Sequence, residues 1–285
     1  MPKTITETKV KKFFKKRKTD SHKGDNGIVL VIGGSTDLIG APALAGMSTM
    51  ACLRTGIDLC IIASPEKAGL IINSFALDLI VKKFKGDFFT KKHLKKINEL
   101  EKKADSVLIG PGIGKEKQTN EFVKEFVQKN RKPLVIDADA IKACAGMKFN
   151  GAVLLTPHEK EFEIFSGKKL YGKNINEKIK LVKETSLKHK CIILLKGKTD
   201  IISDGKKTTL NKTGNAGMTV AGTGDSLAGL CVGFNALGLD LFQAAEAGAF
   251  VNGKIGDLLY KKMGYSYIAS DFAKEVPYWI KKLLN

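Results

Sequence analysis

Residues 214–229 read Gly-Asn-Ala-Gly-Met-Thr-Val-Ala-Gly-Thr-Gly-Asp-Ser-Leu-Ala-Gly. Four glycines precede a single carboxylate, Asp225, and an apolar run with helical spacing follows at once. Glycine lets the backbone turn its N–H groups toward a ligand, and the start of a helix adds free amides and a positive dipole end. The stretch therefore predicts an anion site in which Asp225 accepts a proton from a hydroxyl beside a phosphate. A helix cap is the alternative role for Asp225, and four glycines favour the anion site.

The composition is that of an ordinary globular protein. The chain has 285 residues, of which 43% are hydrophobic and 27% charged, and we expect one domain spanning residues 1–285. Five isolated cysteines without a Cys-x-x-Cys pair argue against disulfides and a zinc site, and favour a reducing compartment. No apolar stretch approaches the ~18 residues of a membrane helix. We therefore expect a cytoplasmic protein with no membrane partner.

The net charge of +19 has two explanations. Residues 9–18 form the densest basic run, which is compatible with nucleic-acid binding. Lysine nevertheless dominates over arginine and recurs through many other segments, which is typical of a solvated surface rather than of bidentate phosphate recognition. We expect no specific nucleic-acid partner and keep such binding as the remote alternative. Residues 1–20 are expected to be a basic, loosely attached segment.

Short apolar runs alternate with amphipathic segments along the chain, which predicts a layered α/β fold with a mostly parallel sheet and helices on both faces. The expected strands are 28–32, 59–63, 107–109, 134–136, 153–155 and 192–195. The expected helices lie near 42–53, 92–103, 119–129, 175–188, 244–262 and 272–284. Residues 200–211 are expected to form a hairpin with its turn at Asp204-Gly205.

Polar or glycine-rich segments follow five of the expected strands. They are Gly33–Ser35, Gly110–Gly114, Asp137–Ala140, Thr156–Glu161 and Lys196–Thr199. Each segment alone is explained by a turn or a cap. Because ligands gather beyond the carboxyl ends of strands in open α/β sheets, five in succession predict one shared crevice. Neither a P-loop nor the dinucleotide fingerprint is present.

In this order the segments resemble the ADP/ATP-dependent NAD(P)H-hydrate dehydratases of the ribokinase-like superfamily, over nearly the whole chain. Five motifs of that family have similar counterparts here. Residues 110–114 are similar to its Gly-Pro-Gly-Leu-Gly, residues 137–139 to Asp-Ala-Asp, and residues 156–161 to Thr-Pro-His-Glu-Gly-Glu. Residues 195–197 are similar to its Leu-Lys-Gly, and residues 215–218 with 222–225 to Asn-Pro-Gly-Met…Gly-Thr-Gly-Asp. The resemblance implies a ribokinase-like fold of three layers, α/β/α. It also implies a homo-oligomer, with a tetramer as one form.

The resemblance implies repair of hydrated nicotinamide cofactors. The S-epimer of NADHX or NADPHX would be phosphorylated at its C6 hydroxyl by ADP, favoured over ATP, and loss of phosphate would restore NAD(P)H. Mg²⁺ is implied, held mostly by water and phosphate oxygens rather than by protein ligands. The implied catalytic base is Asp225, and the implied anion hole is Gly222, Thr223 and Gly224. The implied substrate contacts are Ala41, Gly114, His158 and Asp225, and the implied nucleotide contacts are Lys196, Gly197, Lys198, Thr199, Asp200 and Gly224.

Three positions depart from the family pattern without removing a catalytic group. Ala216 replaces a proline, Ala221 replaces a glycine, and Lys160 replaces the glycine between two glutamates. These changes bear on the preference for the nucleotide and for the epimer of the substrate more than on the reaction. The nearest alternative function is a ribokinase-like kinase of a small alcohol such as a vitamin precursor. It would use the same base and differ only in the fate of the phosphate ester.

Overall fold

One sheet of ten strands organises the part of the chain that the computed structural model describes, residues 2–36 and 41–285. Its strand order is β1-β10-β9-β8-β7-β6-β5-β2-β3-β4. The strands are β1 (Lys3–Thr4), β2 (Ile28–Ile32), β3 (Leu59–Pro65), β4 (Ile80–Phe84), β5 (Ser106–Ile109), β6 (Leu134–Ile136), β7 (Val153–Leu155), β8 (Ile192–Leu195), β9 (Asp200–Ser203) and β10 (Thr208–Asn211). Strand β9 runs antiparallel to both of its neighbours, and all other pairs are parallel. The predicted mostly parallel sheet is confirmed.

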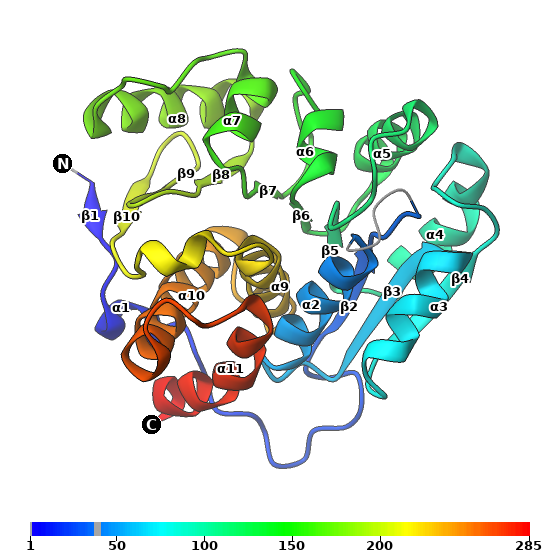
Figure 1. Cartoon of the computed structure of the whole chain (residues 1–285), viewed down its shortest axis with the longest axis horizontal. Helices are drawn as coiled ribbons and strands as arrows, with labels where there is room; N and C mark the ends of the chain where they lie inside the picture. The colour runs from blue at the N-terminus through cyan, green and yellow to red at the C-terminus, as the bar shows by residue number, and fades with distance from the viewer. Residues whose placement is uncertain (1, 37–40) are drawn as a thin grey trace.

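Helices cover both faces of this sheet, as predicted (Figure 1). The helices are α1 (Glu7–Lys11), α2 (Ala41–Leu53), α3 (Glu66–Phe75), α4 (Leu94–Glu101), α5 (Lys117–Lys129), α6 (Asp139–Ala143), α7 (Glu159–Ser166), α8 (Ile175–His189), α9 (Thr223–Ala236), α10 (Leu241–Met263) and α11 (Ala269–Leu284). Two short 3-10 helices, η1 (Lys91–His93) and η2 (Ala216–Thr219), precede α4 and α9. Together with the sheet these helices form three layers.

Successive side chains of the central strands lie alternately in two separate hydrophobic clusters. In β2, Val29 and Val31 pack toward α2, α9, α10 and α11, whereas Leu30 and Ile32 pack toward α4 to α8. This division follows from the strand period of two residues, which sends successive side chains to opposite faces. Because both faces are covered, β2 and residues 107–109 of β5 are continuous Val, Ile and Leu, and the sequence marks them clearly.

The beginning of the chain is part of the fold, which corrects the expectation of a loosely attached segment over residues 1–20. Strand β1 pairs with β10, and the side chains of Ile5 and Val10 are buried in the cluster under α10 and α11. The ring of Phe14 meets that of Phe234 edge-on, with 5.0 Å between centroids. The expectation arose because lysines dominate the segment, while its few apolar residues supply the anchors. Residues 12–27 form no helix or strand and bulge away from the body (Figure 1).

Candidate active site

The glycine-rich stretch ends at the first turn of α9, and Gly222 makes this junction possible. Gly222 precedes the helix with φ +98°, and a Cβ atom there would lie 2.4 Å from the Met47 methyl carbon. A side chain is therefore excluded by both the backbone conformation and the available space. The Thr223 hydroxyl donates to the carbonyls of Met218 (2.8 Å) and Val220 (3.1 Å), which ties the helix to the loop before it. The first-turn amides of α9 lack carbonyl partners within the helix, and the Thr223 N–H makes only a long contact of 3.5 Å to the Val220 carbonyl before it. These amides can therefore turn toward an anion.

Asp225 lies in this first turn with an unusual carboxyl group. The residue is 9% exposed, and its Oδ1 is buried with no hydrogen-bond partner among the described residues. Burial and the Asp137 carboxylate raise its pKa to about 8, although the Lys196 ammonium acts in the opposite direction. A hydrogen bond from its own backbone N–H lowers the pKa of Asp225, and this bond alone would fit the helix-cap role. An unpartnered buried oxygen instead suits a group that receives a proton from a ligand.

Lys196 brings the ends of β6, β7 and β8 together beside Asp225. Its Nζ donates to Oδ1 of Asp137 at 3.0 Å and lies 4.0 Å from Oε2 of Glu161. A Cβ atom built on Gly224 would lie 3.2 Å from the same Nζ, so the ammonium group sits against the start of α9. Burial opposes the charge, but the carboxylates of Asp137 and Glu161 outweigh it and raise the pKa of Lys196. The ammonium group therefore stays charged at the place where an anion would bind.

The turn from Lys196 to Asp200 joins β8 to β9 and is closed by its own residues. Oδ1 of Asp200 accepts from the Gly197 N–H at 3.0 Å, and Oδ2 accepts from the Asn211 side-chain amide at 2.9 Å. Burial raises the pKa of Asp200 to about 6 against these hydrogen bonds. Both carboxyl oxygens thus shape the turn. Gly197 and Lys198 are exposed, and Thr199 is half-buried.

His158 lies at the carboxyl end of β7 and begins helix α7. Its Nδ1 accepts from the Glu161 N–H at 3.3 Å, and the Glu161 carboxylate accepts from the His158 N–H at 2.9 Å. This reciprocal capping box fixes the start of α7 and aims the buried Glu161 carboxylate toward Lys196. The His158 ring remains half exposed, and its Nε2 lies 3.4 Å from Oε1 of Glu161.

Two further residues, Gly114 and Ala41, were predicted to contact the substrate. Gly114 is buried, with φ +87°, in the loop beyond β5. Ala41 begins α2, and its side chain lies outside the described part of the chain. Of the three departures, Ala216 occupies the first position of η2, where proline is favoured, and Ala221 and Lys160 are exposed.

Asp137 and Glu161 lie beside Lys196 in this site, although neither was predicted from the sequence to have a role. Asp137 directly follows the buried strand β6, and Glu161 lies in the first turn of α7. A carboxylate placed immediately after a buried parallel strand was the available signal for Asp137. Glu161 could not be distinguished by sequence from an ordinary first-turn glutamate.

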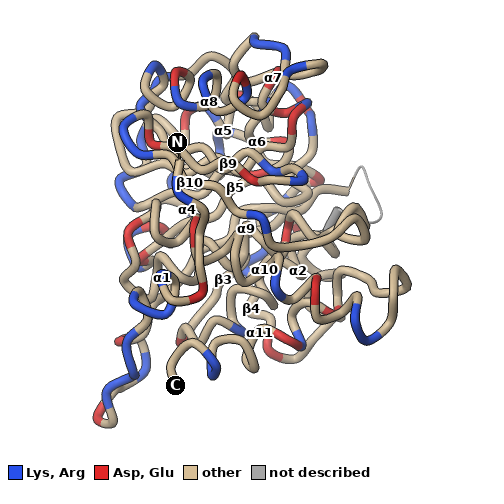
Figure 2. The backbone as a smooth tube through the Cα atoms, turned by 90° about the vertical axis from the view of Figure 1, so that its left-hand side faces the viewer, with Lys and Arg blue, Asp and Glu red and all other residues tan. Residues whose placement is uncertain are grey.

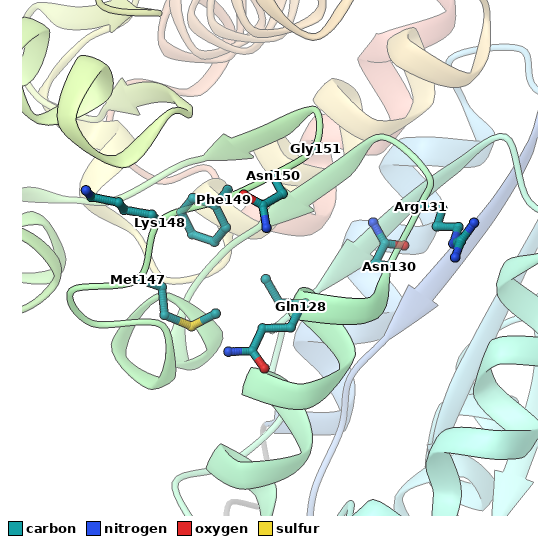
Figure 3. Close-up of a pocket in the computed structure, with 9 residues that line it drawn as sticks. Gln128, Asn130, Arg131, Met147, Lys148, Phe149, Asn150 and Gly151 are labelled. Atoms are coloured by element: carbon teal, nitrogen blue, oxygen red, sulfur yellow. The ribbon is translucent and has the colours of Figure 1, made fainter.

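Two cavities of the described structure lie at the amino ends of the strands, at the opposite edge from Asp225. One, of about 380 Å³, is lined by the end of α5 and the loop before β7 (Figure 3). The other, of about 950 Å³, lies between residues 13–26 and the ends of α9 and α11. Neither is lined by a predicted site residue.

The arrangement matches known proteins in both fold and sequence. The ADP/ATP-dependent NAD(P)H-hydrate dehydratase from Bacillus subtilis, co-crystallized with ATP/Mg²⁺, superposes with a TM-score of 0.85 at 24% identity, covering 99% of each chain. The bifunctional NAD(P)H-hydrate repair enzyme of Pyrobaculum aerophilum is 39% identical over 268 residues, which are 93% of this chain and 53% of that protein. The ADP-dependent (S)-NAD(P)H-hydrate dehydratase of Nitrosopumilus maritimus is 37% identical over 282 residues, 96% of this chain and 95% of that protein.

The fold and the glycine-rich helix start place the chain in the ribokinase-like class of α/β proteins. A family model described as NAD(P)H-hydrate dehydratase matches residues 29–278, and the chain belongs to that family. It spans about half the length of the bifunctional relatives that it matches. In the described part of the chain, we find no helix with the length and apolar character that a membrane crossing requires.

Proposed function

We propose that this protein is an ADP-dependent (S)-NAD(P)H-hydrate dehydratase that returns the S-epimer of NADHX or NADPHX to NAD(P)H. The observation that carries the proposal is the buried, unpartnered Oδ1 of Asp225 at the start of α9. A carboxylate there has the position and the raised pKa of a base for a hydroxyl held beside a phosphate. Family membership supports the choice of a hydrated cofactor as the hydroxyl compound.

The proposed reaction has two stages, and the residues divide between them. Asp225 takes the proton from the C6 hydroxyl while that oxygen attacks the terminal phosphoryl group of the nucleotide. The bond between this group and the bridging oxygen breaks, which releases AMP when ADP is the donor. Amides of Gly222, Thr223 and Gly224 and the ammonium of Lys196 stabilise the charge on the transferring group. The C6–O bond then breaks as the ring nitrogen donates its lone pair, phosphate leaves, and loss of a C5 proton gives the dihydropyridine ring.

The remaining assignments position the two substrates. Ala41, Gly114 and His158 would contact the hydrated cofactor, and residues 196–200 with Gly224 would contact the nucleotide. Their placement at the carboxyl ends of β5, β7 and β8 and at the starts of α2 and α9 supports this division. ADP as the donor is supported by the name of the Nitrosopumilus relative, which matches this chain over nearly its full length.

Mg²⁺ fits this site as a nucleotide-bound ion. Among the described residues no group of three His, Cys, Asp or Glu side chains could hold a metal, so phosphate oxygens and water would supply most ligands. Asp137 is engaged by Lys196 and Glu161 by the His158 N–H, so neither carboxylate is free to bind the ion. The ion would neutralise charge on the phosphates when it is bound.

The assay follows NADH absorbance from S-NADHX with ADP and with ATP in parallel. We expect NADH to form with ADP faster than with ATP. No absorbance gain with either nucleotide would reject the dehydratase. A stable phosphate ester of another alcohol would instead identify the small-alcohol kinase.

Asp225→Asn tests the base directly. The variant keeps the size of the side chain but cannot accept the proton, so we expect turnover to fall by at least about 10²-fold. Nucleotide affinity should change little, because the amides and Lys196 remain. Wild-type kcat/KM should rise with pH toward about 8, where Asp225 becomes ionised. Near-wild-type turnover of the variant would return Asp225 to the role of a helix residue.

A further inference from the structure

Behind Lys196 lies a carboxylate that faces no solvent. Asp137 is 2% exposed, and its Oδ1 accepts both from Lys196 Nζ at 3.0 Å and from the Thr156 hydroxyl at 2.7 Å. Thr156 is itself fully buried. A flexible lysine side chain loses its freedom when a buried, oriented carboxylate holds its head group. The pair therefore fixes where the ammonium group lies.

The backbone that carries Asp137 is unusually constrained. Ala138, the next residue, has φ +53° and ψ −129°, a conformation that side-chain-bearing residues rarely adopt and that is strained. On the other side, Gly110 lies directly against the Asp137 carbonyl, and a Cβ atom on Gly110 would come within 1.9 Å of that oxygen. Such strain persists only where the surroundings determine the position of the chain. Here they determine the position of the Asp137 carboxylate.

The ammonium group that Asp137 holds lies at the anion site. It is 3.2 Å from the place where a Cβ atom of Gly224 would be, next to the first-turn amides of α9. Its other acidic neighbours are Glu161, whose carboxylate lies at 4.0 Å and is bonded to the His158 N–H, and Asp225 in the first turn of α9. Without Asp137, Lys196 would lose its short contact, and its ammonium group would be free to move between Glu161 and Asp225.

We propose that Asp137, oriented by Thr156, is a positioning residue that holds Lys196 at the start of α9 to receive the nucleotide phosphates. This inference rests on the proposed function, which supplies the nucleotide. It adds Asp137 and Thr156 to the residues of that site. The charge of Asp137 also acts on Asp225, so it has a second effect. Its negative charge helps to keep Asp225 a stronger base than an ordinary carboxylate.

The test measures ADP and ATP affinity by calorimetry, which requires no dehydratase activity. Asp137→Asn and Lys196→Met should each weaken nucleotide binding by roughly ten- to a hundredfold. The double variant should bind no more weakly than Lys196→Met alone, because one residue acts through the other. Thr156→Val should weaken binding, and Thr156→Ser, which retains the hydroxyl, should restore it.

Asp139→Asn is the matched control from the same Asp-Ala-Asp segment. Asp139 pairs with Lys142 at 2.7 Å, and its replacement should leave nucleotide affinity unchanged. In the dehydratase assay, Asp137→Asn should also move the rise of kcat/KM to lower pH, because one negative charge beside Asp225 is gone. A merely structural role would lower stability without moving this profile.

Two outcomes would overturn the inference. One is wild-type nucleotide affinity in Asp137→Asn, and the other is a double variant whose loss equals the product of the two single losses. Failure of the proposed function gives a different result. In that case S-NADHX yields no NADH, while nucleotide affinity still depends on Asp137, Thr156 and Lys196 in the expected way.

Discussion

At the scale of single residues, Asp225 opposes the stability of the fold that presents it. Its pKa is raised from 3.8 in the unfolded chain to about 8 in the folded protein, by burial first and then by Asp137. Between these two values the unfolded carboxyl group releases a proton that the folded one retains. Stability is therefore lost as pH rises from about 4 toward 8. This sign is opposite to that of a salt-bridged aspartate.

Asp225→Asn should remove this pH dependence and stabilise the protein at neutral pH. We expect the free energy of unfolding of the variant to exceed that of the wild type at pH 7, by a margin at least about 1 kcal/mol larger than at pH 5. Urea unfolding at the two pH values measures this margin. Asp139→Asn, in an ion pair away from Asp225, serves as the control and should show no such gain. An equal margin at both pH values would contradict the raised pKa.

At the scale of elements, the sequence predicted the central strands and missed those at the edges. Strands β2, β6, β7 and β8 begin and end where the apolar runs do, because burial on both faces requires continuous Val, Ile and Leu. Edge strand β4, Ile-Val-Lys-Lys-Phe, is mostly exposed and carries no such pattern. Two-residue β1 owes its pairing to β10, where Lys3 lies opposite Thr209, far along the chain. Strand order and edge pairing depend on contacts that no local pattern encodes.

The active-site segments were predictable as strand ends, but their mutual contacts were not. The glycines and Asp225 stand out in the sequence because few residue types fit a tight loop at a helix start. The Asp137–Lys196 contact joins two strands 59 residues apart, and nothing local to either predicts it. The strained Ala138 was equally hidden, because alanine is not a residue type that signals a positive φ.

Substitution of Gly110 tests how much the loops after β5 and β6 depend on the close approach of Gly110 to the Asp137 carbonyl. Gly110→Ala would place a methyl group 1.9 Å from the Asp137 carbonyl oxygen at a φ of +127°. We expect a loss of about 3 kcal/mol or more in the free energy of unfolding, with weakened nucleotide binding. Gly146→Ala is the matched control, because Gly146 also has a positive φ but no atom lies within 4 Å of the place where its Cβ would be. Gly146→Ala should lower the free energy of unfolding by only about 1 kcal/mol. Equal losses in the two variants would show that the backbone conformation, and not the close contact, determines the loss.

At the scale of the whole molecule, the large positive charge is distributed over the chain rather than gathered at the active site. Figure 2 shows Lys and Arg along helices, loops and the bulging segment near the N-terminus. Within that segment, Arg17 pairs with Asp58, whose carboxylate also accepts from the N–H groups of Gly24 (2.8 Å) and Asn26 (3.1 Å). The basic segment is thus held to the body, and its lysines reach solvent from an anchored backbone.

The N-terminal anchors should matter to the stability of the entire domain. Val10 is fully buried in the cluster that α9, α10 and α11 share, and Lys9 beside it forms an ion pair with the buried Glu246. Val10→Ala removes two buried methyl groups and leaves a cavity, so we expect a loss of about 2 kcal/mol in the free energy of unfolding. Thermal and urea unfolding measure it.

Leu77→Ala is the control for this truncation, because Leu77 is fully exposed and its shortening should change stability by less than about 0.5 kcal/mol. The loss in Val10→Ala should appear as one cooperative transition at lower denaturant, since Val10 packs into the same core as the helix that carries Asp225. A separate early transition, with the main one unchanged, would instead mean that the N-terminal segment detaches by itself. Wild-type stability would restore the expectation of a loosely attached segment, and only a shared loss is consistent with β1 and α1 as parts of the sheet and its helical layer.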